Sequence, residues 1–345
     1  MIFMNESIKD NITIINQGGL YMLNSKSNYK IGVMSGVISA ATWGLDTVLM
    51  SLVLAMTPFL PKEAVFLAPF VTAFFHDAFS AIWTFLYLAC KRQLGSLFKA
   101  MRTKSAMFVV IAALMGGPIG MTGYLLAVKL IGPSYTAIIS SLYPAVGAIL
   151  SYFILKEKLN KKAWIGLLFA IVGVTVLGYS SGEAGISIAG FLCAFLCVIG
   201  WGSECVICAY GMKDDEVSSE FALQIRQLTS AVVYGILIVP IVGGIGLSFD
   251  ILRTNVIWWI AATALSGTIS YLFYYNAIYR IGPTRAMGIN ITYVVWSIVF
   301  DRFINGTEIS LKTILCSILV IVGVYFVAKE ADVEEDGENA EVAEV

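Results

Sequence analysis

The chain has 345 residues, 58% of them hydrophobic and 13% charged, and its mean hydropathy is +0.83. Soluble domains carry about twice that share of charged residues, so the composition predicts a polytopic membrane protein that is surrounded by the lipid bilayer. The formal net charge of −1 gives no indication of a nucleic-acid partner.

Residues 1–29 precede the first long apolar segment, and we expect them to form a short cytoplasmic arm. They lack the basic start, compact apolar core and small-residue cleavage site of a signal peptide. Ten apolar segments follow, most of them long enough to cross a bilayer as helices. The segments are residues 31–54, 64–89, 106–130, 134–155, 163–180, 186–210, 220–243, 256–280, 284–304 and 311–328. Residues 330–345 are acidic without apolar periodicity, which predicts a disordered tail.

The positively charged residues are distributed unevenly between the two ends of these segments. With the N-terminus in the cytoplasm, the cytoplasmic side holds 16 Lys and Arg residues and the opposite side holds 5, while Arg226 lies inside a segment. Lys and Arg concentrate in the cytoplasmic loops of membrane proteins, so the sequence predicts that both termini are cytoplasmic. We therefore expect a multi-pass protein of the cell (cytoplasmic) membrane.

The sequence contains an internal repeat with a shift of 150 residues. Matching stretches are Ala127–Pro133 with Ala277–Pro283, His76-Asp77 with Arg226-Gln227, and Tyr143 with Tyr293. Each half has five segments, an odd number, so the second half must enter the membrane from the opposite side. The sequence therefore predicts an all-α fold of ten transmembrane helices in two inverted repeats, residues 30–180 and 186–328. This architecture is typical of secondary transporters.

The first segment contains Trp43-Gly44-Leu45-Asp46, and the sixth contains Trp201-Gly202-Ser203-Glu204 at a shift of 158. In each, the aromatic and acidic residues lie about one helical turn apart on the same face. An indole beside a carboxylate suits an organic cation, so these four residues are candidates for a binding site. Anchoring at the membrane interface is the alternative role for the tryptophans, although both lie well inside their segments.

His76, the only histidine, lies in the second segment and is followed by Asp77. Its side chain titrates near neutral pH, so His76 could relay or sense a proton, as could Glu204. A hydrogen-bonded core histidine is the alternative.

Glu204 lies near the middle of the sixth segment. A charge at the centre of a membrane helix costs about 2.5–3.5 kcal/mol, so such residues usually face a bundle interior or a substrate path. Arg226 could neutralise Glu204, in which case Glu204 would offer no free charge to a cation. Both roles for Glu204 remain open at this point.

Aromatic and amide side chains recur at helical spacing in the eighth and ninth segments. They are Tyr271, Tyr274 and Tyr275, spaced i, i+3, i+4, and Asn290, Tyr293 and Trp296, spaced i, i+3, i+6. Each set lies on one face of its helix, so together with the two tryptophans they could build an aromatic box. Packing against neighbouring helices is the alternative.

Four of the six cysteines lie within residues 186–212 at helical spacing. This spacing is typical of small packing residues rather than of a zinc site, which would also need loops and further histidines. The chain has no phosphate-binding glycine loop, no dinucleotide fingerprint and no nucleophile elbow. The sequence therefore indicates no metal, no cofactor and no enzyme activity.

The ten segments, the five-plus-five repeat and Tyr143-Pro144 ahead of Lys156-Glu-Lys158 resemble the EamA-type drug/metabolite transporter (DMT) superfamily over residues 30–328. Short polar motifs inside the segments are similar to those of bacterial LicB-type choline transporters. They are His76-Asp77, Gly117–Met121, Trp201–Glu204, Ile225–Gln227 and Asn290–Trp296. The resemblance implies choline import for the decoration of surface polymers, through an aromatic box with a carboxylate. The matching positions are Trp43, His76, Trp201, Glu204, Tyr275, Asn290 and Tyr293. Asp46 departs from the pattern, where a small residue is more usual.

We therefore expect a secondary active transporter that imports choline or a closely related quaternary amine by alternating access. Membrane potential, protons or both would drive it. The main alternative is an exporter of amino acids, amines or drugs on the same fold. Another is a membrane receptor or assembly factor that binds a ligand without transporting it. An intramembrane enzyme would need a nucleophile–base pair or a metal set, which the sequence lacks, and the sequence does not indicate an oligomeric state.

Overall fold

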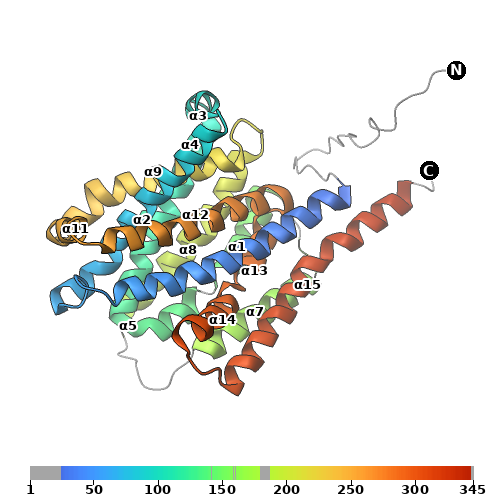
Figure 1. Cartoon of the computed structure of the whole chain (residues 1–345). Helices are drawn as coiled ribbons and strands as arrows, with labels where there is room; N and C mark the ends of the chain where they lie inside the picture. The colour runs from blue at the N-terminus through green and yellow to red at the C-terminus, as the bar shows by residue number, and fades with distance from the viewer. Residues whose placement is uncertain (1–24, 141, 158, 160, 179–186, 343–345) are drawn as a thin grey trace.

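The computed structural model describes residues 25–140, 142–157, 159, 161–178 and 187–342, and within these ranges the regular structure is entirely helical (Figure 1). Most of the predicted arm, residues 1–24, lies outside the described residues. The helices run together as one bundle with the loops near its ends. This arrangement agrees with the expected all-α class.

The first half of the chain begins with two long helices and continues through shorter ones. The elements are α1 (Ser25–Leu54), α2 (Lys62–Cys90), α3 (Leu94–Ala100), α4 (Lys104–Leu114), the π-helix η2 (Met115–Met121), α5 (Thr122–Ser140), α6 (Tyr143–Ile154) and α7 (Lys161–Gly178). The Thr103 side chain accepts a hydrogen bond from the Ala106 N–H and so caps α4.

The second half follows the same general order. Its elements are α8 (Ile188–Met212), α9 (Ser219–Val233), the π-helix η3 (Tyr234–Ile238), α10 (Val239–Ile241), α11 (Ile245–Leu252), α12 (Val256–Ile281), α13 (Pro283–Asn290), α14 (Tyr293–Asn305) and α15 (Leu311–Val342). Ser187 and Ser218 cap α8 and α9 in the same way as Thr103 caps α4.

Most of the described residues of the ten predicted apolar segments lie in these helices. Among the described residues, seven helical stretches are long and apolar enough to cross a membrane, and Tyr143–Ile154 and Leu311–Val327 are shorter apolar helices. The number of ten crossings and the cytoplasmic position of the termini remain predictions.

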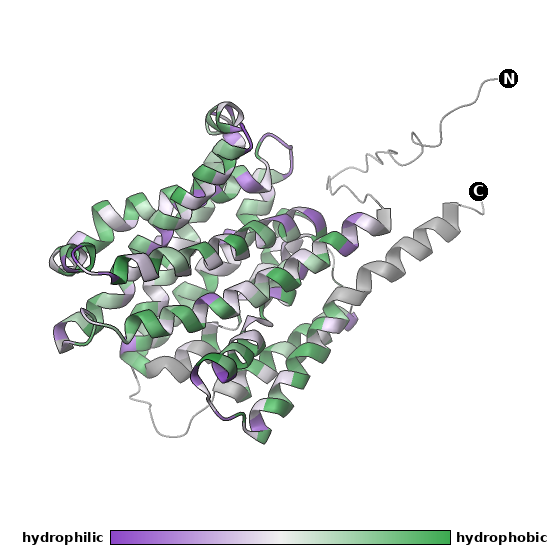
Figure 2. Cartoon of the chain, viewed as in Figure 1, coloured by the Kyte–Doolittle hydropathy of each residue, from purple (hydrophilic) through white to green (hydrophobic). Residues whose placement is uncertain are grey.

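Large apolar side chains cover the outside of the bundle. Ile188, Ile236, Trp258 and Phe303 are each at least 69% exposed. Figure 2 shows apolar residues along the lengths of the helices and hydrophilic residues mainly near their ends. A surface of this kind requires lipid rather than water around it, which agrees with a multi-pass membrane protein.

The fourth and ninth predicted segments are broken at equivalent positions. α5 ends at Ser140 and α6 begins at Tyr143, while α13 ends at Asn290 and α14 begins at Tyr293. These two pairs of residues differ by the 150-residue shift of the repeat. Discontinuous helices at matching positions of two repeats are where transporters usually place their substrate site, because the break exposes polar backbone near the midplane.

The two Ile-Gly-Pro stretches fill the gaps between predicted segments at residues 131–133 and 281–283, where we expect loops, but they differ in structure. Ile281-Gly-Pro283 forms a turn in which Gly282 adopts a φ of 80° and caps α12, and Pro283 starts α13. Ile131-Gly-Pro133 lies within α5 instead. The expected loop between the third and fourth segments is therefore wrong, and the interruption comes about ten residues later, after Ser140.

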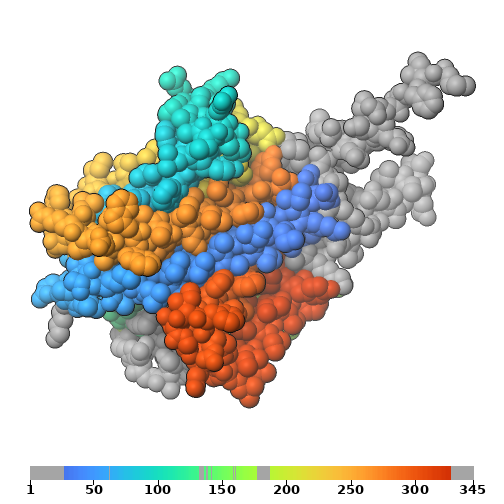
Figure 3. All heavy atoms as spheres, in the orientation of Figure 1, coloured from blue at the N-terminus to red at the C-terminus, as the bar shows by residue number. Residues whose placement is uncertain are grey.

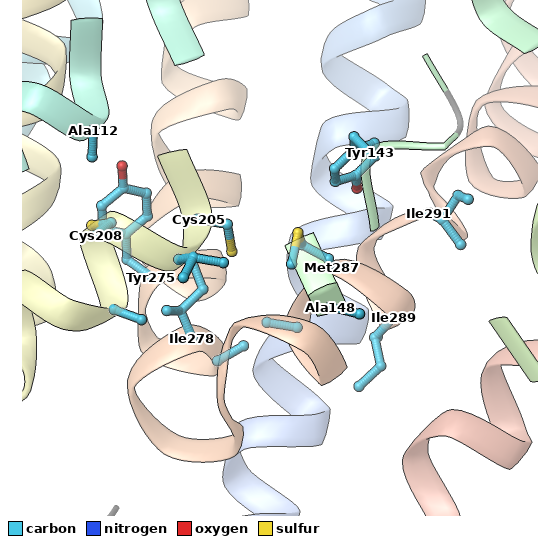
Figure 4. Close-up of a cluster of buried hydrophobic side chains, with 14 of the residues drawn as sticks. Ala112, Tyr143, Ala148, Cys205, Cys208, Tyr275, Ile278, Met287, Ile289 and Ile291 are labelled. Atoms are coloured by element: carbon cyan, nitrogen blue, oxygen red, sulfur yellow. The ribbon is translucent and has the colours of Figure 1, made fainter. Parts of the chain in front are cut away.

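The bundle core joins both halves. α1 lies against α12 and α14 along one face of the molecule (Figure 3). Inside, α6 and α8 approach closely at Gly147 and Gly202, where a larger residue would meet the facing backbone or Met287. Figure 4 shows Tyr143, Cys205 and Met287 in one buried cluster drawn from α6, α8 and α13.

α15 packs along α7 through glycines, with Gly166 and Gly323 lying against each other's backbone. α15 continues to Val342, so it includes most of the acidic tail that was expected to be disordered. Ala and Glu are strong helix formers, and they extend a helix whose start is already held by packing.

Candidate functional site

A cavity of about 90 Å³ lies beside the two helix breaks and is lined by both halves of the chain. Seven aromatic side chains line it, namely Trp43, Tyr143, Trp201, Tyr271, Tyr274, Tyr275 and Tyr293. The polar lining consists of Ser39, Glu204, Cys205, Ser270 and Asn290, and Met121 and Ile278 complete it. Glu204 therefore supplies the one carboxylate among the lining residues.

The aromatic rings hold one another by edge-to-face contacts. The ring centroids of Trp43 and Tyr271 are 5.2 Å apart at an interplanar angle of 79°, and those of Tyr143 and Trp201 are 6.0 Å apart at 89°. Tyr124 stacks on Trp201 at 5.3 Å. Such pairs fix the orientation of each ring before any ligand arrives, which lowers the entropy cost of binding.

Glu204 is held from two sides. Its Oε1 accepts hydrogen bonds from Arg226 Nε at 2.8 Å and from the Tyr275 hydroxyl at 3.5 Å. Its Oε2 lies against Gly116 in the π-helix η2, where even a single added side-chain carbon would collide with the carboxylate. Gly116 therefore makes room for Glu204, and the neighbouring Gly117 does the same for the Ser230 hydroxyl.

Glu204 belongs to a chain of buried charged groups, called the ionic chain below, that extends away from the cavity. Its members are Glu204, Arg226, Asp77, His76 and Asp46. Arg226 Nη1 lies 3.4 Å from both carboxylate oxygens of Asp77. The His76 ring lies 3.6 Å from Asp77 through Nδ1 and 3.1 Å from Asp46 through Nε2. These five side chains are at most 13% exposed, and buried charges persist in proteins only when they are paired in this way.

Seven of the ten candidate residues from the sequence line the cavity. They are Trp43, Trp201, Glu204, Tyr271, Tyr275, Asn290 and Tyr293. Asp46 and His76 lie in the ionic chain instead, and Trp296 stacks on Phe300 with the ring centroids 6.3 Å apart. Trp296 is offset because the chain turns at Ile291 and Thr292, so the i, i+3, i+6 pattern does not follow one continuous helix.

Two kinds of lining residue were absent from the sequence candidates. Tyr143 was noted only as the repeat partner of Tyr293, and that equivalence was the signal that could have placed it in the site. Ser39 and Ser270 carry no such signal, since serines are frequent in membrane helices. Ser39 Oγ donates a hydrogen bond to Asn290 Oδ1 at 3.3 Å and thereby orients this amide at the cavity wall.

A second polar contact joins the halves at the opposite end of α13 from Asn290, which lines the cavity. Glu157, in the loop after α6, accepts a hydrogen bond of 2.7 Å from the Thr284 hydroxyl in the first turn of α13. Arg285 Nη1 lies 3.9 Å from its other oxygen. Burial raises the pKa of the Glu157 carboxyl, while the Thr284 hydrogen bond and the Arg285 charge oppose that rise.

Among the described residues, no group of three or more His, Cys, Asp or Glu side chains has the arrangement of a metal site. The cysteines of α8 serve as packing residues, and Cys205 contacts the Tyr274 hydroxyl. What the arrangement offers is binding: aromatic faces, one carboxylate, and a few neutral hydrogen-bonding groups.

Comparison with known proteins places the chain in a family. The EamA-like transporter family matches residues 30–179 and again residues 188–329. The chain is 36% identical to Protein LicB of Haemophilus influenzae over 215 residues, which is 62% of this chain and 72% of LicB. It therefore belongs to the EamA-like transporter family of the DMT superfamily and is a homologue of LicB.

More distant relatives extend over more of the chain. The riboflavin transporter ImpX of Fusobacterium nucleatum is 26% identical over 320 residues, which is 88% of this chain and 99% of ImpX. One solved crystal structure matches with a TM-score of 0.63 at 16% identity, covering 87% of this chain and 97% of the solved one. That likeness shows the fold alone.

Proposed function

We propose that this member of the EamA-like transporter family imports choline or a closely related quaternary amine across the cytoplasmic membrane by alternating access. The observation that carries the proposal is the cavity lined by seven aromatic side chains and one carboxylate. A trimethylammonium group cannot donate a hydrogen bond, so its binding must come from ring faces, at about 0.5–2 kcal/mol each, and from nearby negative charge.

The charges around the cavity support a cationic substrate. The ionic chain contains three carboxylates, from Asp46, Asp77 and Glu204, and two groups that can be positive, His76 and Arg226. With all five charged, one net negative charge remains, and with a neutral histidine two remain. A monovalent cation compensates this excess, whereas an anion would increase the electrostatic cost.

The neutral lining groups suit the other end of choline. Asn290 is at the cavity wall, close to Ser39, and can bind the choline hydroxyl. His76, the other candidate for that contact, lies between Asp46 and Asp77, so the hydroxyl role falls to Asn290. A compact cavity of about 90 Å³ with a carboxylate favours a small cation over a large uncharged flavin.

The driving force follows from the charge of the substrate. An inside-negative potential favours the inward movement of a monovalent cation by about 2.3 kcal/mol per 100 mV. Protons can add to this if Glu204 or His76 changes protonation during the cycle. Choline flux that is unaffected by collapsing the pH gradient at fixed voltage would argue against proton coupling.

The test is uptake of radiolabelled choline into liposomes that contain the purified full chain, with an inside-negative potential imposed. We expect saturable uptake that betaine, carnitine and acetylcholine inhibit to different degrees and that riboflavin leaves unchanged. Binding of choline without any flux would favour a receptor. Absence of both choline binding and choline flux would overturn the proposal and favour an exporter of amino acids, amines or drugs.

A further inference from the structure

Arg226 makes the same two contacts that a cationic substrate needs. Its Nε donates to Glu204 at 2.8 Å, and its guanidinium carbon lies 4.7 Å from the centre of the Tyr271 ring. Both Glu204 and Tyr271 line the cavity. The guanidinium thus uses the carboxylate and one aromatic face of the site, although Arg226 itself is 3% exposed and is anchored on α9.

A second acceptor for the same guanidinium lies on the side away from the cavity. Asp77 Oδ1 and Oδ2 are each 3.4 Å from Arg226 Nη1, longer than the bond to Glu204. The Gln227 side chain accepts from the same nitrogen at 2.8 Å, and the Ser230 hydroxyl donates to Asp77. Asp77 can therefore form a closer ion pair with the guanidinium if Arg226 moves. Asp77 is not among the residues that line the cavity.

We propose that Arg226 is a tethered competitor of the substrate, and that a bound cation displaces the guanidinium from Glu204 toward Asp77. The inference rests on the proposed function and names how that site is regulated. Two cations cannot both be fully compensated by one carboxylate at contact distance, because their mutual repulsion rises as water is excluded. Because Arg226 has a carboxylate on each side, it can break its ion pair with Glu204 and remain paired with Asp77, so it does not become an unpaired buried charge.

The alternative is a purely structural role, in which Arg226 orients Glu204 and stays in place. The two roles predict opposite results. If Arg226 competes, removing its charge frees Glu204 and tightens the binding of choline, whereas removing Asp77 leaves the arginine with Glu204 as its only carboxylate and weakens binding. If Arg226 only orients Glu204, its removal weakens binding, and the removal of Asp77 weakens binding only by the loss of one negative charge at longer range.

The experiment measures equilibrium binding of choline to the full chain in detergent at one pH, by calorimetry, for the wild type, Arg226→Gln and Asp77→Asn. We expect binding about tenfold tighter for Arg226→Gln and about tenfold weaker for Asp77→Asn, the size of one charge-assisted contact. Glu220→Gln is the matched control, because the partly exposed Lys91–Glu220 pair joins α9 to the residue directly after α2. Its affinity should stay at the wild-type value.

A neutral isostere separates charge competition from a change in pocket shape. In 3,3-dimethylbutan-1-ol, a carbon atom replaces the ammonium nitrogen of choline. The ratio of choline affinity to isostere affinity should rise in Arg226→Gln and fall in Asp77→Asn, which a merely structural defect would not produce.

The outcomes also distinguish a failure of this inference from a failure of the proposed choline transport. A wild-type protein that binds no choline overturns the proposed function and this inference with it. Choline binding by the wild type, with weaker binding in Arg226→Gln, overturns the inference alone. Should Arg226→Gln fail to fold, the sign for Asp77→Asn decides, since unchanged or tighter binding there contradicts displacement toward Asp77.

Discussion

Asp46 and Glu204 hold equivalent positions in the two repeats, and each is paired with the residue at the equivalent position of the following long helix. Asp46 lies 3.1 Å from His76, and Glu204 lies 2.8 Å from Arg226. Each repeat therefore contains a carboxylate paired with a basic residue. In the first repeat the partner, His76, can lose its charge, and in the second repeat the partner, Arg226, is permanently charged. Only the second of these carboxylates reaches the cavity.

Replacing Trp201 with alanine should weaken choline binding while expression is retained. Trp201 lines the cavity and is held by Tyr124 and Tyr143, so its loss removes one ring face and loosens two others. One cation–π contact of about 0.5–2 kcal/mol corresponds to a loss of ~2- to 30-fold in affinity. The measurement is choline binding and uptake, with Trp258→Ala, an exposed tryptophan of α12, as control. Unchanged uptake in Trp201→Ala would remove the cavity from the transport path.

Glu204→Gln should reduce choline affinity more than Asp46→Asn does. Glu204 faces the cavity, and the loss of a charge-assisted contact of about 1.5–3 kcal/mol corresponds to ~10- to 150-fold weaker binding. Asp46 faces His76 instead, so its charge acts on the ligand only at longer range. Calorimetry on the two variants gives the order, and an equal or larger effect for Asp46→Asn would show that the substrate contacts the first repeat's carboxylate.

Gly116→Ala should damage the site without changing its charge. An added methyl group at this position collides with the Glu204 carboxylate, so either the acid or the π-helix must move. Overpacking of this kind costs about 1–3 kcal/mol of stability, and we expect choline affinity to fall as the carboxylate leaves its place. Gly246→Ala is the control, since that glycine has open space around it. Wild-type affinity in Gly116→Ala would mean that the position of Glu204 is not important for binding.

Glu157→Gln should change the pH dependence of stability. Because burial raises the pKa of Glu157 in the folded protein, the folded state retains a proton that the unfolded chain releases. The stability that this carboxyl contributes is therefore full at pH values below its ordinary pKa and is lost as the pH rises through the raised value. Thermal unfolding in detergent should show Glu157→Gln gaining stability relative to the wild type as the pH increases across that window.

The exposed Glu308 offers the control for this measurement, because Glu308→Gln makes the same chemical change at the surface, and its melting temperature is compared with that of the wild type over the same pH range. A melting-temperature difference between Glu157→Gln and the wild type that is independent of pH would contradict the assignment. A difference of the opposite sign would mean that Arg285 and Thr284 outweigh burial.

The parts of the site that follow a single helix could be predicted from the sequence. Trp201 and Glu204 are three residues apart in one unbroken helix, so their shared face follows from helical geometry alone. The same reasoning placed Tyr271 and Tyr275 together. The spacing that groups Trp296 with Asn290 and Tyr293 assumes one continuous helix, whereas the chain turns at Ile291 and Thr292 between α13 and α14, and Trp296 is not among the lining residues.

Contacts between helices were beyond local periodicity. The Asp46–His76 and Asp77–Arg226 pairs join positions 30 and 149 residues apart, and only the packing of α1, α2 and α9 brings them together. The repeat gave the best long-range information, since it made Asp46 equivalent to Glu204 and His76 equivalent to Arg226. It did not show that α5 continues through Ile131-Gly-Pro133, because a matching sequence can end one helix and continue another.

The ionic chain also has a mechanical meaning. Asp46, His76 and Asp77 belong to the first repeat, and Arg226 and Glu204 to the second, so the chain crosses from one repeat to the other at the 3.4 Å contact between Asp77 and Arg226. If Arg226 moves toward Asp77, the distance across this contact shortens, and an occupied cavity favours a closer approach of the two repeats. Coupling of this kind is reciprocal, so separating the repeats lowers the affinity for the ligand by the same free energy. Ligand affinity and the distance between the two repeats are thus thermodynamically coupled through these charged residues.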